Sequence, residues 1–176
     1  MDVLVPLLAV LAVVALLLAW SAGRLDHLHT RLERMEATLD AELLRRSAAT
    51  LELATSGALD PATAMVLADA AHRARAASDP AQREESESAL TEALLVAFDD
   101  PDALPDADQP WAHELVVELA NATRRVQTAR RLHNDTVTVT RARRRSPFVR
   151  VLRLAGRAPM PRPEEFDDRV PAAFRR

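Results

Sequence analysis

The chain has 176 residues, a formal net charge of −3 and no cysteine. The lack of cysteine excludes disulfides, thiolate metal sites, cysteine nucleophiles and a lipoprotein anchor. Glycine occurs 3 times, whereas Ala, Leu, Arg and Glu are abundant. This composition predicts an all-α protein with room for one domain of about 150 residues after an N-terminal anchor.

The first predicted element is an apolar helix, Val3 to Trp20, which contains no charged side chain. At about 1.5 Å per residue it measures about 27 Å, close to the ~30 Å hydrocarbon core of a bilayer. We therefore predict that residues 1–23 form a transmembrane anchor and that the lipid bilayer is a partner. A cleaved signal peptide is the alternative, but no basic residue precedes the run. The anchor residues are Val3, Leu4, Leu8, Leu11, Val14, Leu17 and Trp20.

The charges that flank the apolar run predict its orientation. Asp2 precedes it, and Arg24, Arg31 and Arg34 follow it. Because basic residues accumulate on the cytoplasmic side, we expect a single-pass protein of the cell membrane. Its N-terminus would lie outside and residues 24–176 in the cytoplasm.

Residues 24–146 are predicted to form an antiparallel four-helix bundle whose first and last helices are long. The first helix continues from the anchor to about residue 56, where Gly57 is a plausible C-cap. Two Asp-Pro pairs, Asp60-Pro61 and Asp79-Pro80, each combine an N-cap carboxylate with a proline at the first helical position. They predict helices over 61–77 and 80–98.

The fourth helix is predicted over 111–146. Its stretch Thr136 to Thr140, TVTVT, is β-branched and locally favours a strand. Its flanks are helical and contain no turn signal, so we expect the helix to continue through it. The residues expected to be buried on helices two to four are Met65, Val66, Ala70, Leu90, Leu94, Ala97, Phe98, Leu115, Leu119, Ala122, Val126, Ala129 and Leu132.

The first helix also carries a coiled-coil pattern after the anchor. Five apolar residues spaced 3, 4, 3 and 4 apart predict a two-stranded helix seam. The opposing helix is either the fourth helix of the same chain or a second copy, which would make a homo-oligomer. The seam residues are Leu25, Leu28, Leu32, Met35 and Leu39.

The remainder of the chain is predicted in two parts. Residues 147–157 are expected to form a short basic amphipathic helix, with Phe148 and Leu152 on its apolar face. Residues 158–176 are rich in proline and show little periodicity, and we expect an extended or disordered tail.

Charge is distributed unevenly along the chain. Residues 79–118 hold 12 acids and one Arg, whereas residues 121–157 hold 11 Arg and one acid. We interpret the basic part as a surface for anionic lipid or for a partner protein. The alternative is that these arginines are solvated or pair with the acidic helix. The candidate contacts are Arg141, Arg143, Arg144, Arg145, Arg150, Arg153 and Arg157.

No constellation for catalysis or cofactor binding is found in the sequence. Asp69 and His72 approach a di-iron Glu-x-x-His motif once and with the wrong acid. Val117 stands where a zinc-protease helix starting at His113 would need its second histidine. With 3 glycines there is no phosphate-binding loop, and a pI near 6.0 with six aromatics argues against nucleic-acid binding. We predict no metal, no cofactor and no enzymatic activity.

Two stretches resemble segments of the LemA family. Leu39 to Arg46, LDAELLRR, looks like the family's acidic-x-x-Leu-x-Arg-Arg segment. Ala129 to Val137 is similar to its Arg-x-Tyr-Asn-x-x-Val segment, with His133 in place of Tyr. Thr140-Arg141 replace a second Tyr-Asn, so the chain resembles a divergent member over roughly residues 1–167. The resemblance implies a membrane-anchored antiparallel helical bundle, and no catalytic residue is carried over.

We therefore expect a non-enzymatic scaffold or regulatory module at the membrane, with protein partners that the sequence does not identify. The acidic residues 79–108 would be one docking surface and the basic segment 141–157 another. The alternative is a structural protein that self-assembles through the coiled-coil seam.

Overall fold

The structure is a computed structural model that describes residues 4–100, 110–146 and 159–175. Within the first helix, the structure describes the backbone throughout but leaves some side chains undescribed. They are Val10, Val13, Val14, Ala15, Leu17, Leu18, Ala19, Ser21, Ala22, Arg24 and Leu25. The predicted amphipathic segment 147–157 and most of the acidic loop after residue 100 also lie outside the described residues.

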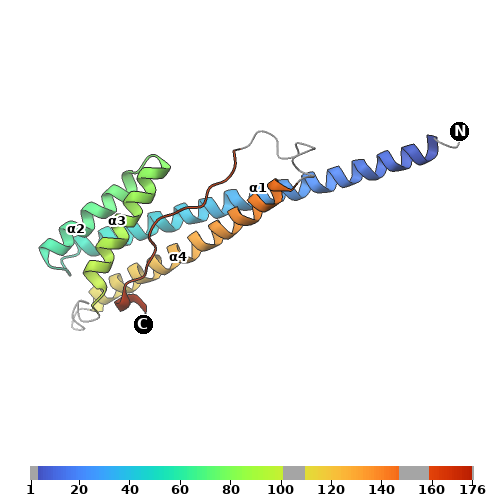
Figure 1. Cartoon of the computed structure of the whole chain (residues 1–176). Helices are drawn as coiled ribbons and strands as arrows, with labels where there is room; N and C mark the ends of the chain where they lie inside the picture. The colour runs from blue at the N-terminus through green and yellow to red at the C-terminus, as the bar shows by residue number, and fades with distance from the viewer. Residues whose placement is uncertain (1–3, 101–109, 147–158, 176) are drawn as a thin grey trace. The chain divides into compact units, whose positions relative to one another are not determined.

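The described residues are all helical where they have regular structure, and they contain no strand, which confirms the all-α prediction (Figure 1). The four long helices end within about one residue of the predicted positions. The elements are α1, Leu4–Thr55; α2, Pro61–Ala76; α3, Pro80–Phe98; α4, Pro110–Arg145; and the 3₁₀ turn η2, Ala172–Arg175.

Local capping explains the helix boundaries. Asp60 Oδ1 accepts hydrogen bonds from the backbone N–H groups of Ala62 and Thr63 at 3.0 and 3.1 Å. Asp79 Oδ1 accepts from Gln82 N at 3.0 Å in the same way. Gly57 has a φ of +82°, so α1 ends in the left-handed conformation that favours glycine. Each of these caps depends on residues within a few positions of the helix end, so the local sequence was enough to predict the boundaries.

The TVTVT stretch is helical, as predicted. Thr138 and Thr140 satisfy their hydroxyls by donating to backbone oxygens four residues earlier, those of Asn134 and Thr136, at 2.9 and 2.8 Å. Val137 is buried. Burial and the flanking helix therefore outweigh the local β preference of these residues.

The chain divides into two compact units. The first unit comprises Met1–Met35 and His133–Pro163, and the second comprises Glu36–Leu132 and Glu164–Arg176. The core of the second unit draws on all four α-helices and on the C-terminal segment. Its fully buried members include Leu53, Leu67, Leu90, Leu94, Phe98, Leu119, Ala122 and Phe174.

The predicted buried face of α2 needs a correction. Met65 and Val66 are 74% and 57% exposed, whereas Ala70 is buried as expected. The buried face is Leu67, Ala70, Ala71 and Ala74, which follows the i, i+3, i+4, i+7 pattern of one helix face. Three of these residues are alanines, whose small side chains let α2 approach its neighbours closely. The larger side chains Met65 and Val66 lie outside this face and point to solvent.

On α3 the predicted residues Leu90, Leu94 and Phe98 are fully buried. On α4 the buried stripe continues only to Ala129 within the second unit, because Leu132 is 48% exposed.

Of the two alternatives for the tail, extended or disordered, residues 159–171 follow the first. Residues 159–171 form no helix, as expected, but they are placed, and η2 follows them. In the second unit, Phe166, Val170, Ala173 and Phe174 are buried. The C-terminal segment, Glu164–Arg175, is therefore part of the core rather than an appendage.

Candidate functional site

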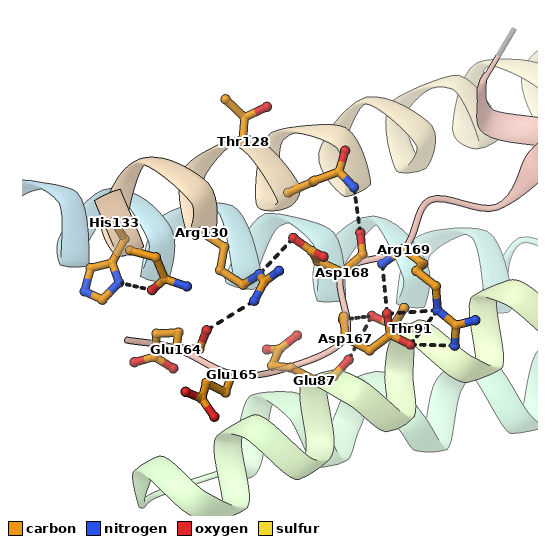
Figure 2. A network of polar contacts seen from close by, with 12 residues as sticks. Glu87, Thr91, Thr128, Arg130, His133, Glu164, Glu165, Asp167, Asp168 and Arg169 are labelled. Atoms are coloured by element: carbon orange, nitrogen blue, oxygen red, sulfur yellow. Dashed lines mark hydrogen bonds and ion pairs between the residues drawn. The ribbon is translucent and has the colours of Figure 1, made fainter. Parts of the chain in front are cut away.

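The most extensive polar site of the second unit holds the C-terminal segment between α3 and α4 (Figure 2). An extended backbone has no hydrogen-bond partners of its own, so its N–H and C=O groups need other donors and acceptors. Here side chains of the two helices supply them. The site is consequently built from residues widely separated in the sequence.

Side chains of α3 bind one edge of the segment. Glu84 Oε1 accepts from Glu165 N at 2.9 Å, and Ser88 Oγ accepts from Asp167 N at 3.0 Å. The Thr91 hydroxyl donates to Asp167 O at 2.6 Å. Residues 84, 88 and 91 lie on one face of a helix, so α3 presents a row of polar groups to the segment.

Side chains of α4 bind the other edge. Gln127 Nε2 donates to Asp168 O at 3.2 Å. Arg130 donates from Nε to Asp168 Oδ2 at 2.8 Å and from Nη1 to Glu164 O at 3.2 Å. Arg124 donates to Phe174 O. Part of the basic charge of α4 thus meets the acidic residues of the C-terminal segment.

Two aromatic rings anchor the segment. Phe174 packs against Phe98 with ring centroids 5.1 Å apart and planes tilted by 33°. Phe166 is buried with Leu39, Val126 and other residues of a smaller core cluster. The Arg130 guanidinium lies over the Phe166 ring, 5.4 Å from its centroid, within cation–π range.

A buried ion pair lies behind this site. Arg46 is fully buried, and its Nη2 donates to Glu87 Oε2 at 2.5 Å. Its Nη1 donates to the Thr91 hydroxyl at 3.0 Å, and that hydroxyl contacts Asp167 O. Arg46 on α1, Glu87 and Thr91 on α3, and Asp167 therefore form one continuous polar junction.

A local brace shapes the turn after Phe166. Arg169 Nη2 donates to Asp167 Oδ2 at 2.7 Å, and Arg169 N donates to Asp167 Oδ1 at 3.0 Å. The hydrogen bond from the Arg169 side chain lowers the pKa of the Asp167 carboxyl. The same contact raises the pKa of Arg169, so both groups stay charged at neutral pH.

The predicted lipid-contact arginines fall into three groups. Arg141 Nε donates to Pro161 O at 2.7 Å, and Arg144, which is 8% exposed, donates to Pro159 O at 2.5 Å. Arg143 is half-buried and Arg145 is exposed. Arg141 and Arg144 therefore hold the chain that follows through its carbonyl oxygens, an arrangement that neither the lipid contact nor the alternative of pairing with the acidic helix had predicted. Arg150, Arg153 and Arg157 lie outside the described residues.

The predicted anchor residues that can be placed lie on the surface of α1. Leu4, Leu8, Leu11 and Trp20 are each more than half exposed. Val3 and the side chains of Val14 and Leu17 lie outside the described residues. Among the described side chains, no helix offers a stretch both long and apolar enough to cross a bilayer.

The predicted seam is placed in part. Leu39 is buried in the second unit against Val126 and Ala129 of α4, so its partner helix belongs to the same chain. In the first unit Leu28, Leu32 and Met35 are half-buried. The side chain of Leu25 lies outside the described residues.

The candidate site offers hydrogen bonding and packing, and we find no reaction chemistry to assign to it. Among the described residues, no three His, Asp or Glu side chains lie close enough together to hold a metal ion.

Sequence reasoning missed the site because its parts are distant in the sequence. In the sequence, Arg46 belongs to a stretch that resembles the LemA family and Glu87 is one of the acids of residues 79–118, and nothing local links the two. One signal in the sequence did point to this segment. Large apolar residues recur every fourth position at Phe166, Val170 and Phe174, and two of the three are aromatic in a chain with only 3% aromatic residues.

No protein-family model, curated protein or solved structure matches this chain. The resemblance to the LemA family therefore stays a prediction.

Proposed function

We propose that this protein is a single-pass, membrane-anchored helical module that acts without catalysis as a scaffold or regulatory partner at the membrane. The observation that carries the proposal is the uncharged run Val3 to Trp20, which continues without a break into the rest of α1.

The exposure of the run supports the anchor. Leu4, Leu8, Leu11, Leu16 and Trp20 leave 55–71% of their surface uncovered by the rest of the chain. Contiguous apolar surface of this kind is unfavourable in water and marks a membrane or protein interface. A bilayer would cover every side of the helix at once.

The arginines that follow the run support a cytoplasmic position for the helical units. Arg31 and Arg34 are exposed on α1, as residues near a membrane surface would be. The resemblance to the LemA family favours a membrane-anchored helical bundle.

The second unit suits a scaffold because its surface is held by fixed contacts. The C-terminal segment joins α3 to α4, and the Arg46–Glu87 pair joins α1 to α3. A rigid surface can recognise a partner without first paying the entropy of ordering. Self-assembly through the seam is less favoured, because Leu39 already packs within its own chain.

Membrane fractionation tests the proposal. We expect the full chain to pellet with membranes and to resist extraction by alkaline carbonate. The variant Leu8→Arg/Leu11→Arg should move to the soluble fraction, because each Arg near the middle of a membrane helix costs about 2.5–3.5 kcal/mol of insertion free energy.

The matched control is Met65→Arg/Val96→Arg, which replaces two exposed apolar residues of the second unit. It should stay with the membranes. A wild-type chain that carbonate extracts, or a Leu8→Arg/Leu11→Arg variant that stays in the pellet, would contradict the anchor.

A further inference from the structure

The first unit contains a groove that the proposed function does not yet use. It has a volume of about 690 Å³ and runs between α1 and α4. Its apolar lining is Leu28 on α1 with Val139 and Ala142 on α4. Val139 is 57% exposed, so the apolar lining is open to an occupant.

Cationic side chains accompany this apolar lining. Arg31 and His27 contribute from α1, and Arg143 contributes from α4, while Ser146 completes the lining. None of the described residues that line the groove is acidic. Two guanidinium groups beside an apolar surface are suited to an amphiphile with an anionic head, because Arg binds phosphate oxygens through paired N–H donors.

These two arginines differ from the neighbouring ones in being uncommitted. Arg141 and Arg144 donate to backbone oxygens of Pro161 and Pro159. Within the part of the chain that the structure describes, the side chains of Arg31 and Arg143 form no hydrogen bond or ion pair. Their positive charges are therefore available to a ligand.

The groove also lies at a suitable distance from the apolar run. Arg31 follows Trp20 by about 16 Å along the helix axis, and His27 by about 10 Å. The headgroup layer of a bilayer is roughly 5–8 Å thick on each side, and arginine side chains can reach back towards it. If the run spans the membrane, a lipid of the adjoining leaflet is the nearest amphiphile.

We propose that this groove binds one anionic glycerophospholipid. The phosphate would lie between Arg31 and Arg143. The acyl-chain carbons nearest the glycerol would lie against Leu28, Val139 and Ala142. This proposal rests on the membrane anchoring proposed above and names the lipid class it selects. The chain's own residues after Ser146 are a poorer occupant, since residues 147–158 carry three Arg and no acid.

The test is competition between two lipids for the full chain in an uncharged detergent, measured by native mass spectrometry. Phosphatidylglycerol and phosphatidylcholine with identical acyl chains are added at equal concentration. We expect wild type to retain phosphatidylglycerol preferentially. In Arg31→Gln/Arg143→Gln the preference should fall by about 30-fold, which is the contribution of two basic contacts with an anionic lipid.

The matched control is Arg73→Gln/Arg131→Gln, which removes the same charge from exposed positions of the second unit. It should keep the wild-type preference. Equal retention of the two lipids by wild type would overturn the proposal. So would an equal loss in both double variants, because general electrostatic attraction would then explain the binding.

The two proposals fail in different experiments. Lipid selectivity in detergent does not require the chain to span a bilayer, and carbonate extraction does not depend on Arg31 or Arg143. A chain that resists carbonate but shows no lipid preference would leave the anchor standing and remove the groove as a lipid site.

Discussion

At the scale of single residues, the junction of Arg46 and Glu87 ties the second unit together. Both side chains are almost fully buried, and the pair is completed by the Thr91 hydroxyl. Burying two charges is costly, so such a pair adds little compared with apolar packing. Removing one partner is different, because the other charge stays buried without compensation.

We predict that Glu87→Ala lowers the free energy of unfolding by about 3–5 kcal/mol. Glu92→Ala, at an exposed position of the same helix, should change it by less than about 0.5 kcal/mol. Urea unfolding of the full chain in uncharged detergent, followed by circular dichroism, measures both. Equal stability of the two variants would show that the Arg46 charge is compensated in some other way.

Asp60 makes a second prediction, which concerns pH. A hydrogen bond to the Thr63 side chain is the main cause that lowers the pKa of the Asp60 carboxyl, and the backbone N–H groups of Thr63 and Ala62 add to it. A lowered pKa means that the ionised cap stabilises the fold above the ordinary value of 3.8. That stability is lost as the pH falls below 3.8 and through the lower pKa of the folded state.

Asn caps helices about as well as Asp but does not titrate. The difference in melting temperature between wild type and Asp60→Asn should therefore be constant at neutral pH. It should shift against the wild type below about pH 4. Thermal unfolding across pH 3–7 measures it, and a pH-independent difference would argue that the carboxylate charge is unimportant to this cap.

At the scale of elements, the C-terminal segment behaves as a structural element without regular hydrogen bonding. Its backbone is held by side chains of α3 and α4, and its rings enter the core. The segment is therefore expected to unfold together with the second unit rather than to fray independently.

The contribution of the C-terminal segment to the stability of the core can be measured by substituting Phe174. We predict that Phe174→Ala costs about 3–5 kcal/mol of unfolding free energy, because it leaves a cavity beside Phe98. Met160→Ala, at an exposed position ahead of the segment, should cost little. If urea unfolding finds Phe174→Ala as stable as wild type, the Phe174 ring does not contribute to the core beside Phe98.

The elements also show which features local sequence could predict. Helix boundaries followed from Asp-Pro caps and Gly57, because these signals act within a few residues. The burial of Phe166 and Arg46 depends on partners far along the chain, such as Val126 and Glu87, and no periodicity within one segment reports such pairs. The exposed Met65 and Val66 show the same limit, since the neighbours of α2 decide which face is buried.

At the scale of the whole molecule, the charge pattern has a partly different explanation from the one expected. Basic residues of α4 contact the acidic C-terminal segment through Arg130 and Asp168, and a carboxylate of the acidic part pairs with Arg46 of α1. The two charged parts of the sequence are therefore used in building the second unit. The arginines left for a ligand are fewer than the sequence suggested.

The apolar run gives the protein its proposed place in the cell. The proposed anchor would fix the helical units to a membrane. The proposed lipid site at Arg31 and Arg143 belongs to the same unit as the run. Every partner proposed for the helical units depends on which side of the membrane they occupy.

The most direct test of this account is therefore the topology of the chain. The protein has no cysteine, so Ala76→Cys at the exposed end of α2 gives a single reactive thiol. Cells expressing the full chain are treated with a membrane-impermeant maleimide before or after lysis. We predict labelling only after lysis, together with recovery of the protein in carbonate-washed membranes. Labelling in intact cells would place the helical units outside, and recovery in the soluble fraction would remove the anchor altogether.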